Sequence, residues 1–511
     1  MEQQTSSGPD PEGPVTPSAS PVSRPMSRRT ALRWSGAALA ALAAPAALAA
    51  CGSDGSGGSD GSAGGTGKTS SDGGTGGADR APSGASSASP PAKSGSGGGS
   101  GKTVSIWLMK YYVDAANAVI EEAAKAAGQQ GGFDVDIQWF PFDATTYSKW
   151  AAAVEAKQLP DIGMPNGYPS QYWAMGKLVD LTDLSNEIAQ DGGGWYDYVE
   201  DYQTVDGKKW WIPLFNELAF GLYRKDVFEA KGITAPITGL DDLVAAATEV
   251  TDPSKKMWGM GMAMAYGDWP HNLPPVMWDF GASLQDTKGN IVSGSDEFVD
   301  AITWYTNLYL KDKVTPPGVT SWTSASNNEF YAAGQIAFCS NTGSIIASLR
   351  ADHPDLLDNT VTSAWGQRGD RGPYSVSNLP AVFITKDSQL QDEAKLVIKT
   401  IMSKEYRGKF LIAANANFLP VLKDDVSISF FSENDLNKHI VTDILPKAQT
   451  RWWPAQATPT FSEVDSQQLW GTLLQRITAQ GWTPRKAVDE FTEAANKIND
   501  KYRKLYPDLF G

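Results

Sequence analysis

Short apolar strands alternate with amphipathic helices from Val104 onward, and this alternation limits the possible folds of the chain more than any other feature. Residues 104–108 and 135–139 have the pattern of strands, and the segment between them carries apolar side chains at helical spacing. Further elements are expected in turn: a helix over 147–157, a short strand over 159–163 and a helix over 170–175. The alternation predicts an α/β fold with a mostly parallel sheet.

The residues before this region have the features of an export signal. Residues 27–32, SRRTAL, resemble a twin-arginine signal, and the apolar run over 37–50 is shorter than the ~20 residues of a membrane span. The run ends in LAACG around Cys51, which resembles a bacterial lipobox. We expect residues 1–51 to be a lipoprotein signal peptide whose final cysteine carries a lipid. The alternative is a cleavage site of small residues beside an incidental cysteine.

Residues 52–101 consist almost wholly of Gly, Ser, Ala, Thr and Asp, which predicts a disordered tether between the membrane and a folded domain. Two GKT triplets in it resemble the end of a phosphate-binding loop, but Ser62 and Ser96 occupy the places of the required first glycine. No cofactor is therefore expected.

Composition excludes several classes of function. A formal net charge of −15 argues against nucleic acid as a partner. With two Cys and three His in 511 residues, and no second His near His271, a metal site is not supported.

A series of short segments, none diagnostic alone, occurs in a specific order. They are LPDI at 159–162, GKLVDL at 176–181, DGKKWWIP at 206–213, LYRKDVF at 222–228, KGI at 231–233, FYAAGQIAF at 330–338 and a closing helical stretch over 486–505. In this order the chain resembles the extracellular solute-binding proteins of carbohydrate ABC importers, the family 1, maltose-binding-protein-like group. The resemblance extends over roughly 104–505.

The resemblance implies a periplasmic-binding-protein-like fold, with two α/β lobes joined by a multi-strand hinge and a ligand cleft between them. Lobe 1 is expected to comprise 102–215 and 381–425, and lobe 2 to comprise 216–380 and 426–511. The implied partners are a sugar or oligosaccharide and the permease subunits of an ABC importer. The implied location is the outer face of the cytoplasmic membrane, where we expect a monomer without enzymatic activity.

Sugars present flat C–H faces edged with hydroxyls, so a sugar site needs aromatic rings and directed polar groups. Asn166 and Tyr168 follow a predicted strand at its carboxyl end, where ligands meet open α/β sheets, although turn chemistry explains this segment equally well. Glu217 lies four residues after Pro213, a spacing that matches a sugar-binding glutamate of the family, and Asn216 is beside it.

The remaining candidates come from segments that the resemblance places near the cleft. They are Trp269, Trp278, Asp279, Asn341, Trp365, Asn378 and Trp453. Ile345 stands where the family commonly has Trp, which weakens the case for stacking by that loop. For any of the Trp residues, a place in the core is the alternative.

Two other functions remain open. A binding protein for a peptide, polyamine or chelate would use the same aromatic residues, and a cationic ligand would need several carboxylates around Glu217 and Asp279. An exported glycoside hydrolase would need a pair of carboxyl groups across the scissile bond. The carboxylates are scattered in the sequence and the three His are isolated, which favours a binding protein.

Overall fold

The computed structural model describes residues 101–111, 113–141, 144–165, 169–264 and 269–507. The predicted signal peptide with Cys51, the tether up to residue 100, and the candidates Asn166 and Tyr168 lie outside these residues. Within the described part of the chain, none of the helices has both the length and the apolar composition of a membrane span.

The first sheet has five strands in the order β2-β1-β3-β12-β6. Their bounds are β1 Thr103–Met109, β2 Asp134–Phe140, β3 Ile162–Gly163, β6 Ile212–Pro213 and β12 Ala381–Ile384. β1 is parallel to β2 and β3, whereas β12 is antiparallel to β3 and β6. The strands expected over 104–108 and 135–139 are confirmed, each with one more residue at both ends.

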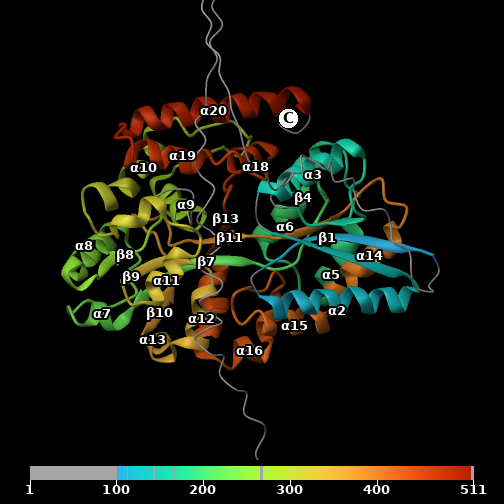
Figure 1. Ribbon diagram of the computed structural model, residues 1–511, viewed down its shortest axis with the longest axis horizontal. Helices are drawn as coiled ribbons and strands as arrows, with labels where there is room; N and C mark the ends of the chain where they lie inside the picture. Colours follow the sequence, from blue (N-terminus) through green and yellow to red (C-terminus); the bar gives the residue numbers. More distant parts are fainter. Residues whose placement is uncertain (1–100, 112, 142–143, 166–168, 265–268, 508–511) are drawn as a thin grey trace, which may run out of the picture. The chain divides into compact units, whose positions relative to one another are not determined.

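Helices flank this sheet on both sides (Figure 1). They are α2 Asp114–Gly131, α3 Ala144–Ala156, α4 Ser170–Ala174, α5 Thr182–Asp191, α6 Asp197–Gln203, α14 Gln391–Ile401 and α15 Lys404–Ala413, with the hairpin β4 Thr204–Val205 and β5 Lys208–Lys209. α2 buries a stripe that includes Ala116, Ile120 and Ala123, and α14 and α15 pack against it. Gly132, with φ of 69°, ends α2 in the left-handed conformation that glycine adopts without strain.

The second sheet has the order β13-β11-β7-β9-β8, and β10 also pairs with β7. The bounds are β7 Glu217–Arg224, β8 Trp258–Met260, β9 Ile336–Asn341, β10 Thr360–Ser363, β11 Ser375–Asn378 and β13 Ala448–Thr450. β7 lies inside this sheet, which explains why residues 218–223 are apolar or glycine and all buried.

The helices associated with the second sheet come from two stretches of chain. The first supplies α7 Lys225–Glu229, α8 Leu240–Val250, α9 Trp269–Phe280, α10 Asp296–Leu310, α11 Ser326–Ala332, α12 Ser344–Asp352 and α13 Pro354–Asp358. The second supplies α16 Ser429–Ser432, α17 Asp435–His439, α18 Pro459–Ser466, α19 Leu469–Thr478 and α20 Pro484–Leu505. α9 packs on β9 and β11, and α20 lies along α10, α18 and α19 (Figure 1).

The chain passes between the sheets at two strand pairs: from β6 to β7 over 213–217, and from β11 to β12 over 378–381. A third segment, around Leu419, forms paired backbone hydrogen bonds with Asn216. The parallel arrangement expected from the opening strand–helix alternation is confirmed for β1, β2 and β3. Both sheets are nevertheless mixed, because β7 and β12 enter from these connections and run antiparallel to their neighbours.

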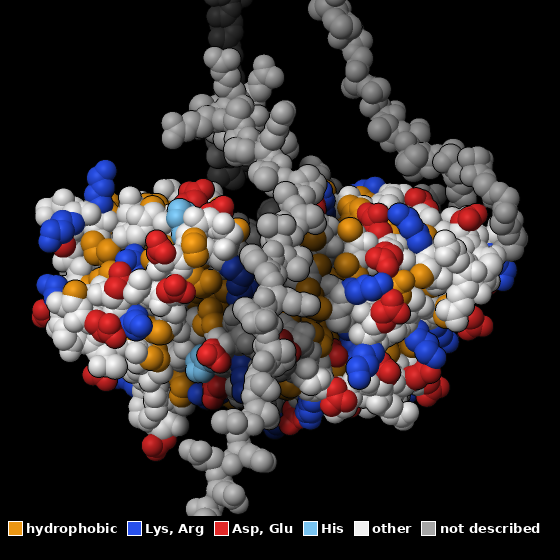
Figure 2. Space-filling view, turned by 90° about the horizontal axis from the view of Figure 1, so that it is seen from below, with side chains coloured by type: hydrophobic (Ala, Val, Ile, Leu, Met, Phe, Trp, Pro, Cys, Tyr) orange, Lys and Arg blue, Asp and Glu red, His pale blue; other side chains and the backbone are white. Residues whose placement is uncertain are grey.

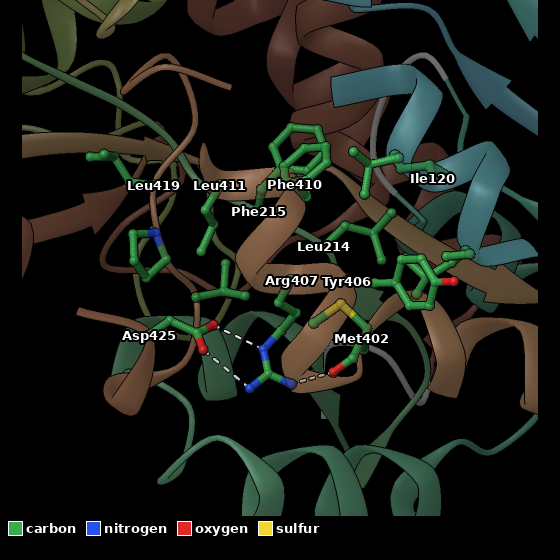
Figure 3. A pocket seen from close by; sticks show the side chains of 15 residues that line it. Ile120, Leu214, Phe215, Met402, Tyr406, Arg407, Phe410, Leu411, Leu419 and Asp425 are labelled. Carbon is green, nitrogen blue, oxygen red and sulfur yellow. Dashed lines mark hydrogen bonds and ion pairs between the residues drawn. The ribbon is translucent and has the colours of Figure 1, made fainter. Parts of the chain in front are cut away.

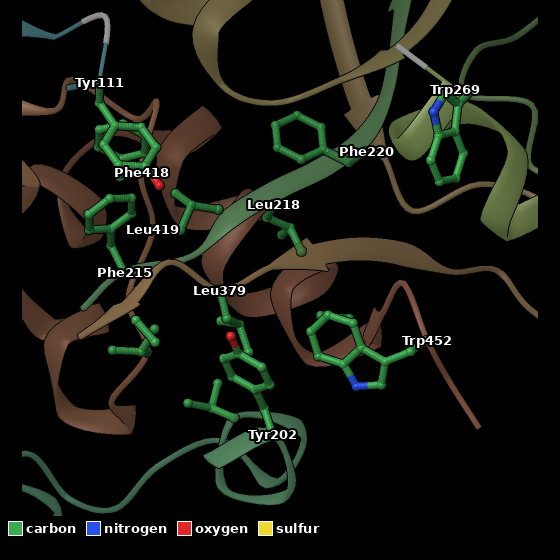
Figure 4. Close-up of a cluster of buried hydrophobic side chains, with 14 of the residues drawn as sticks. Tyr111, Tyr202, Phe215, Leu218, Phe220, Trp269, Leu379, Phe418, Leu419 and Trp452 are labelled. Atoms are coloured by element: carbon green, nitrogen blue, oxygen red, sulfur yellow. The ribbon is translucent and has the colours of Figure 1, made fainter. Parts of the chain in front are cut away.

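Buried aromatic residues pack around the connections between the sheets (Figure 4). The ring of Phe215 lies 4.9 Å from that of Tyr111 and 4.3 Å from that of Phe418. Farther along, Tyr202 of α6 and Trp452 contact each other with ring centroids 5.0 Å apart. The connections are therefore part of the hydrophobic core.

Candidate functional site

The candidate site lies on the face of the second sheet where β7 begins and β11 ends. The antiparallel register pairs Asn378 with Glu217 and Val376 with Ala219, so these four side chains share one face. β13 runs parallel to β11 and pairs Thr450 with Ser377, which brings the following residue, Arg451, next to Asn378.

A chain of polar contacts joins these residues. Asn378 donates through Nδ2 to Glu217 Oε2 at 2.5 Å, and Arg451 Nη2 donates to Asn378 Oδ1 at 3.3 Å. Arg451 Nη1 also lies 3.7 Å from Asp465 Oδ2 on α18. Burial raises the pKa of Glu217 to about 7, while the hydrogen bond from Asn378 and the charge of Arg451 act in the opposite direction. Burial likewise raises the pKa of Asp465, and Arg451 opposes this rise.

An aromatic cluster of Trp278, Tyr374 and Trp453 lies on the same face, over Ala219 and Val376. The Trp278 ring meets the other two nearly edge-on, with centroids 5.4 Å from Tyr374 and 5.8 Å from Trp453. Trp278 is 1% exposed, and its Nε1–H has no acceptor among the described residues, whereas Tyr374 and Trp453 are half-buried. Successive residues on one face of a strand are about 7 Å apart, so the cluster is adjacent to Glu217 and Asn378.

Four predicted residues are therefore brought together: Glu217, Asn378, Trp278 and Trp453. Asn216 is next to them in sequence but is fully buried, and its side chain is bonded to Tyr198 and Ser377. We interpret Asn216 as a connector between the sheets, and its contact with a ligand stays a prediction.

Asp279 is close in sequence to Trp278 but lies beneath the turn 365–374. It is 1% exposed, and neither carboxyl oxygen has a hydrogen-bond donor among the described residues. A Cβ on Gly366 or Gly372 would lie 2.6 Å or 2.8 Å from these oxygens, and φ is positive at both glycines. Burial raises the pKa of Asp279 to about 8, against the opposing charges of Arg371 and Arg368.

Three other candidate residues lie in the hydrophobic core around the second sheet. Trp269 stacks on Trp470 with ring centroids 4.9 Å apart. Trp365 is fully buried and donates through Nε1 to Ser340 Oγ at 3.0 Å, and Asn341 Nδ2 donates to Asn327 Oδ1 at 3.1 Å. For these residues a ligand contact stays a prediction.

Sequence reasoning did not select Arg451, Tyr374 or Asp465 as site residues. Arg451 precedes the Trp-Trp-Pro segment, and that position was the available signal. For Tyr374 the available signal was its place directly before residues 375–378, from which Asn378 was selected. Asp465 carried no such signal, because an acidic residue on an amphipathic helix has the pattern of a solvated position.

An apolar pocket lies next to the connections between the sheets, between α2, α15 and residues 419–421 (Figure 3). Its polar end is the buried pair of Arg407 and Asp425, with Nε–Oδ2 and Nη2–Oδ1 distances of 2.9 Å and 3.1 Å. Because Arg407 also donates to Asp191 and the Met402 carbonyl, its guanidinium is engaged by protein groups. The pocket has aromatic rings in its lining, those of Phe215, Tyr406 and Phe410, but its charged pair is already engaged by protein groups. It therefore offers fewer directed polar groups than a sugar site needs.

The part of the chain that the structure describes contains no cluster of three or more His, Cys, Asp or Glu that could hold a metal ion.

Comparison with known proteins gives a family and a fold. Residues 121–434 match the family described as bacterial extracellular solute-binding protein. A putative binding protein of Brucella abortus is 24% identical over 246 residues, 48% of this chain, and the match spans only 58% of that relative's length. A putative binding protein of Brucella suis matches with the same identity and coverage.

Solved structures share the fold at low sequence identity. An ABC transporter solute-binding protein from Thermotoga lettingae, bound with alpha-D-tagatose, is 21% identical with a TM-score of 0.65, and the match covers 78% of this chain and all of that one. Maltose-bound T. maritima MalE3 is 20% identical with a TM-score of 0.65, covering 77% and 100%. A sugar transporter from Arthrobacter chlorophenolicus with bound laminaribiose is 18% identical with a TM-score of 0.66, and the match covers 78% of this chain and 99% of that one. The expected two-lobed α/β fold is confirmed.

Proposed function

The chain belongs to the bacterial extracellular solute-binding proteins, and on that premise we propose that it captures a neutral sugar or oligosaccharide for an ABC importer. The observation that carries the proposal is the placement of Glu217 and Asn378 beside the aromatic cluster of Trp278, Tyr374 and Trp453. Aromatic rings stack on the C–H faces of a sugar, and a carboxylate and an amide bind its hydroxyls.

The charge balance of the site supports a neutral ligand over a polyamine or another cation. Glu217 and Asp465 both lie near the positive charge of Arg451. Asp279, the other carboxyl group that a cation would need, is covered by the turn 365–374, and its raised pKa favours the neutral acid. A desolvated cation would therefore find its nearest carboxylates already compensated.

The same contacts favour binding over hydrolysis. A glycoside hydrolase needs two carboxyl groups that both face the scissile bond. In this structure Glu217 is bonded to Asn378, and Asp465 is on the far side of Arg451. Incubation of the protein with candidate oligosaccharides should therefore leave them intact, which mass spectrometry of the sugars can check.

In this proposal lobe 1 comprises residues 102–215 and 381–425, lobe 2 comprises 216–380 and 426–511, and the ligand is enclosed between them. Three neighbouring structures that hold tagatose, maltose or laminaribiose support the choice of carbohydrate. Export with lipidation of Cys51 would keep the monomeric protein at the membrane beside its permease. Mass spectrometry of Cys51 in the membrane fraction, with Cys51→Ala as the soluble control, tests the anchor.

The ligand class is tested by a thermal-shift screen of the purified protein against mono- and oligosaccharides, amino acids, peptides and polyamines. A ligand at 100 times its Kd should stabilise the protein by about 2.7 kcal/mol. The response to a sugar should be lost in Glu217→Ala and kept in Glu249→Ala, which alters an exposed glutamate of α8. A response confined to another class of solute would overturn the carbohydrate assignment and leave the capture role.

A further inference from the structure

We propose that Arg451 is the positioning residue of the site: it fixes the orientation of the Asn378 amide and keeps the Glu217 carboxylate available as a hydrogen-bond acceptor. The role of Arg451 in sugar capture rests on the proposed function. Its effect on Asn378 and Glu217 is a property of the protein without ligand and can be tested there.

The donors and acceptors allow a single orientation of Asn378. Arg451 can only donate, so the amide oxygen of Asn378 must face it, at the observed 3.3 Å. The amide nitrogen then faces Glu217, whose ionised carboxylate can only accept. Arg451 thus acts on Glu217 through Asn378.

Asp465 holds Arg451 from the other side. Its carboxylate lies 3.7 Å from Nη1, and the Arg451 side chain is 12% exposed, so the pair is partly removed from solvent. Asp465 belongs to α18, which is capped by Thr458; that hydroxyl is also bonded to Gln285 at 2.6 Å. The helix that carries Asp465 is therefore anchored independently of Glu217.

The polar and titratable groups near Glu217 and Arg451 come from four parts of the chain: Asn378 and Arg451 act on Glu217 directly, and Asp465 and His271 lie near Arg451. β11 supplies Asn378, the end of β13 supplies Arg451, α18 supplies Asp465, and α9 supplies His271. Burial and the charge of Arg451 lower the pKa of His271 to about 3, so this imidazole is neutral at physiological pH. Arg451 is the cation whose charge opposes protonation of Glu217.

The expected consequence is a shift in the titration of Glu217. Its pKa of about 7 reflects burial opposed by Asn378 and Arg451. Removing the charge of Arg451 raises this pKa, and Glu217 then becomes protonated at neutral pH and loses acceptor capacity. Removing the charge of Asp465 leaves Arg451 uncompensated and lowers the pKa of Glu217.

The test is a ¹³C NMR titration of the Glu217 carboxyl carbon in the full chain without ligand, with the resonance assigned by its loss in Glu217→Gln. Relative to the wild-type midpoint, Arg451→Met should raise the midpoint by about one pH unit or more, and Arg451→Lys should largely restore it. Asp465→Asn should lower the midpoint. Arg485→Met, which removes an arginine paired with Asp296 on the surface, should leave it unchanged.

An unchanged midpoint in folded Arg451→Met, or a rise in Asp465→Asn, would overturn the inference. Should Arg451→Met not fold, Arg451→Lys and Asp465→Asn carry the test. The titration needs no sugar. If no sugar bound, the proposed function would be contradicted, but the inference about Arg451 would not. When a sugar does bind, the pH dependence of its Kd should follow the carboxyl midpoint in each variant.

Discussion

The side-chain amide of Asn216 donates to the hydroxyl of Tyr198 across 2.7 Å, and this bond ties the connection between the two sheets to helix α6. Asn216 Oδ1 also accepts from Ser377 Oγ at 2.9 Å, and its backbone pairs with Leu419. One fully buried residue of the first connection thus contacts α6, β11 and the segment around Leu419.

Replacing Asn216 with Ala should destabilise the protein by about 1 to 3 kcal/mol, because it leaves buried hydroxyls of Tyr198 and Ser377 without their amide partner. Urea unfolding of the variant measures this loss. Asn496→Ala, on the exposed side of α20, is the matched control and should change stability little. Equal stability of the two variants would contradict the connecting role.

Replacing only one member of the buried ion pair of Arg407 and Asp425 should destabilise the protein much more than replacing both members with apolar residues. Arg407→Met should lose about 3 to 5 kcal/mol, because it leaves Asp425 charged in a site where both groups are almost fully buried. The double variant Arg407→Met with Asp425→Leu should recover most of that loss. Chemical denaturation of both variants measures the difference. If the double variant were as unstable as the single one, the pair would be stabilising in itself.

The fold was largely predictable because its signals are local. The strand–helix alternation after Val104 and the order of short segments such as 206–213 predicted the α/β lobes that the structure and the structural neighbours confirm. The strand directions were not predictable in the same way. Whether β7 is parallel or antiparallel to its neighbours depends on which sheet the chain enters, and no local pattern records that.

The site was less predictable, since it depends on pairing between distant strands. Glu217 and Asn378 are 161 residues apart and become neighbours only through the register of β7 and β11. Trp269 and Trp278 belong to the same helix, yet one stacks in the core on Trp470 and the other joins the aromatic cluster. The two side chains point to different faces of the helix, and composition alone cannot predict which face meets the core and which meets the aromatic cluster.

Asp279 should make stability depend on pH. Its pKa is about 8 in the folded protein and near 3.8 in an unfolded chain, so the folded state holds the proton more tightly. The associated stability is complete below pH 4 and declines as the pH rises towards 8. Asp279→Asn should therefore gain more than about 1 kcal/mol relative to wild type at pH 9 and nothing at pH 4. Thermal unfolding at the two pH values measures the gain.

A pair of tryptophan substitutions should separate binding from packing. Trp453 is half-buried at the aromatic cluster, so Trp453→Ala should weaken sugar binding about 10-fold or more with a small change in stability. Trp269 is stacked on Trp470 in the core, so Trp269→Ala should lose about 3 to 5 kcal/mol of stability. Where the Trp269 variant remains folded, its sugar affinity should equal that of wild type.

Calorimetric titration measures the sugar affinity of each variant, and urea unfolding measures its stability. The assignment of Trp453 to the ligand would be wrong if its variant bound sugar normally, and a selective loss of affinity in the Trp269 variant would move the site towards α9 and α19.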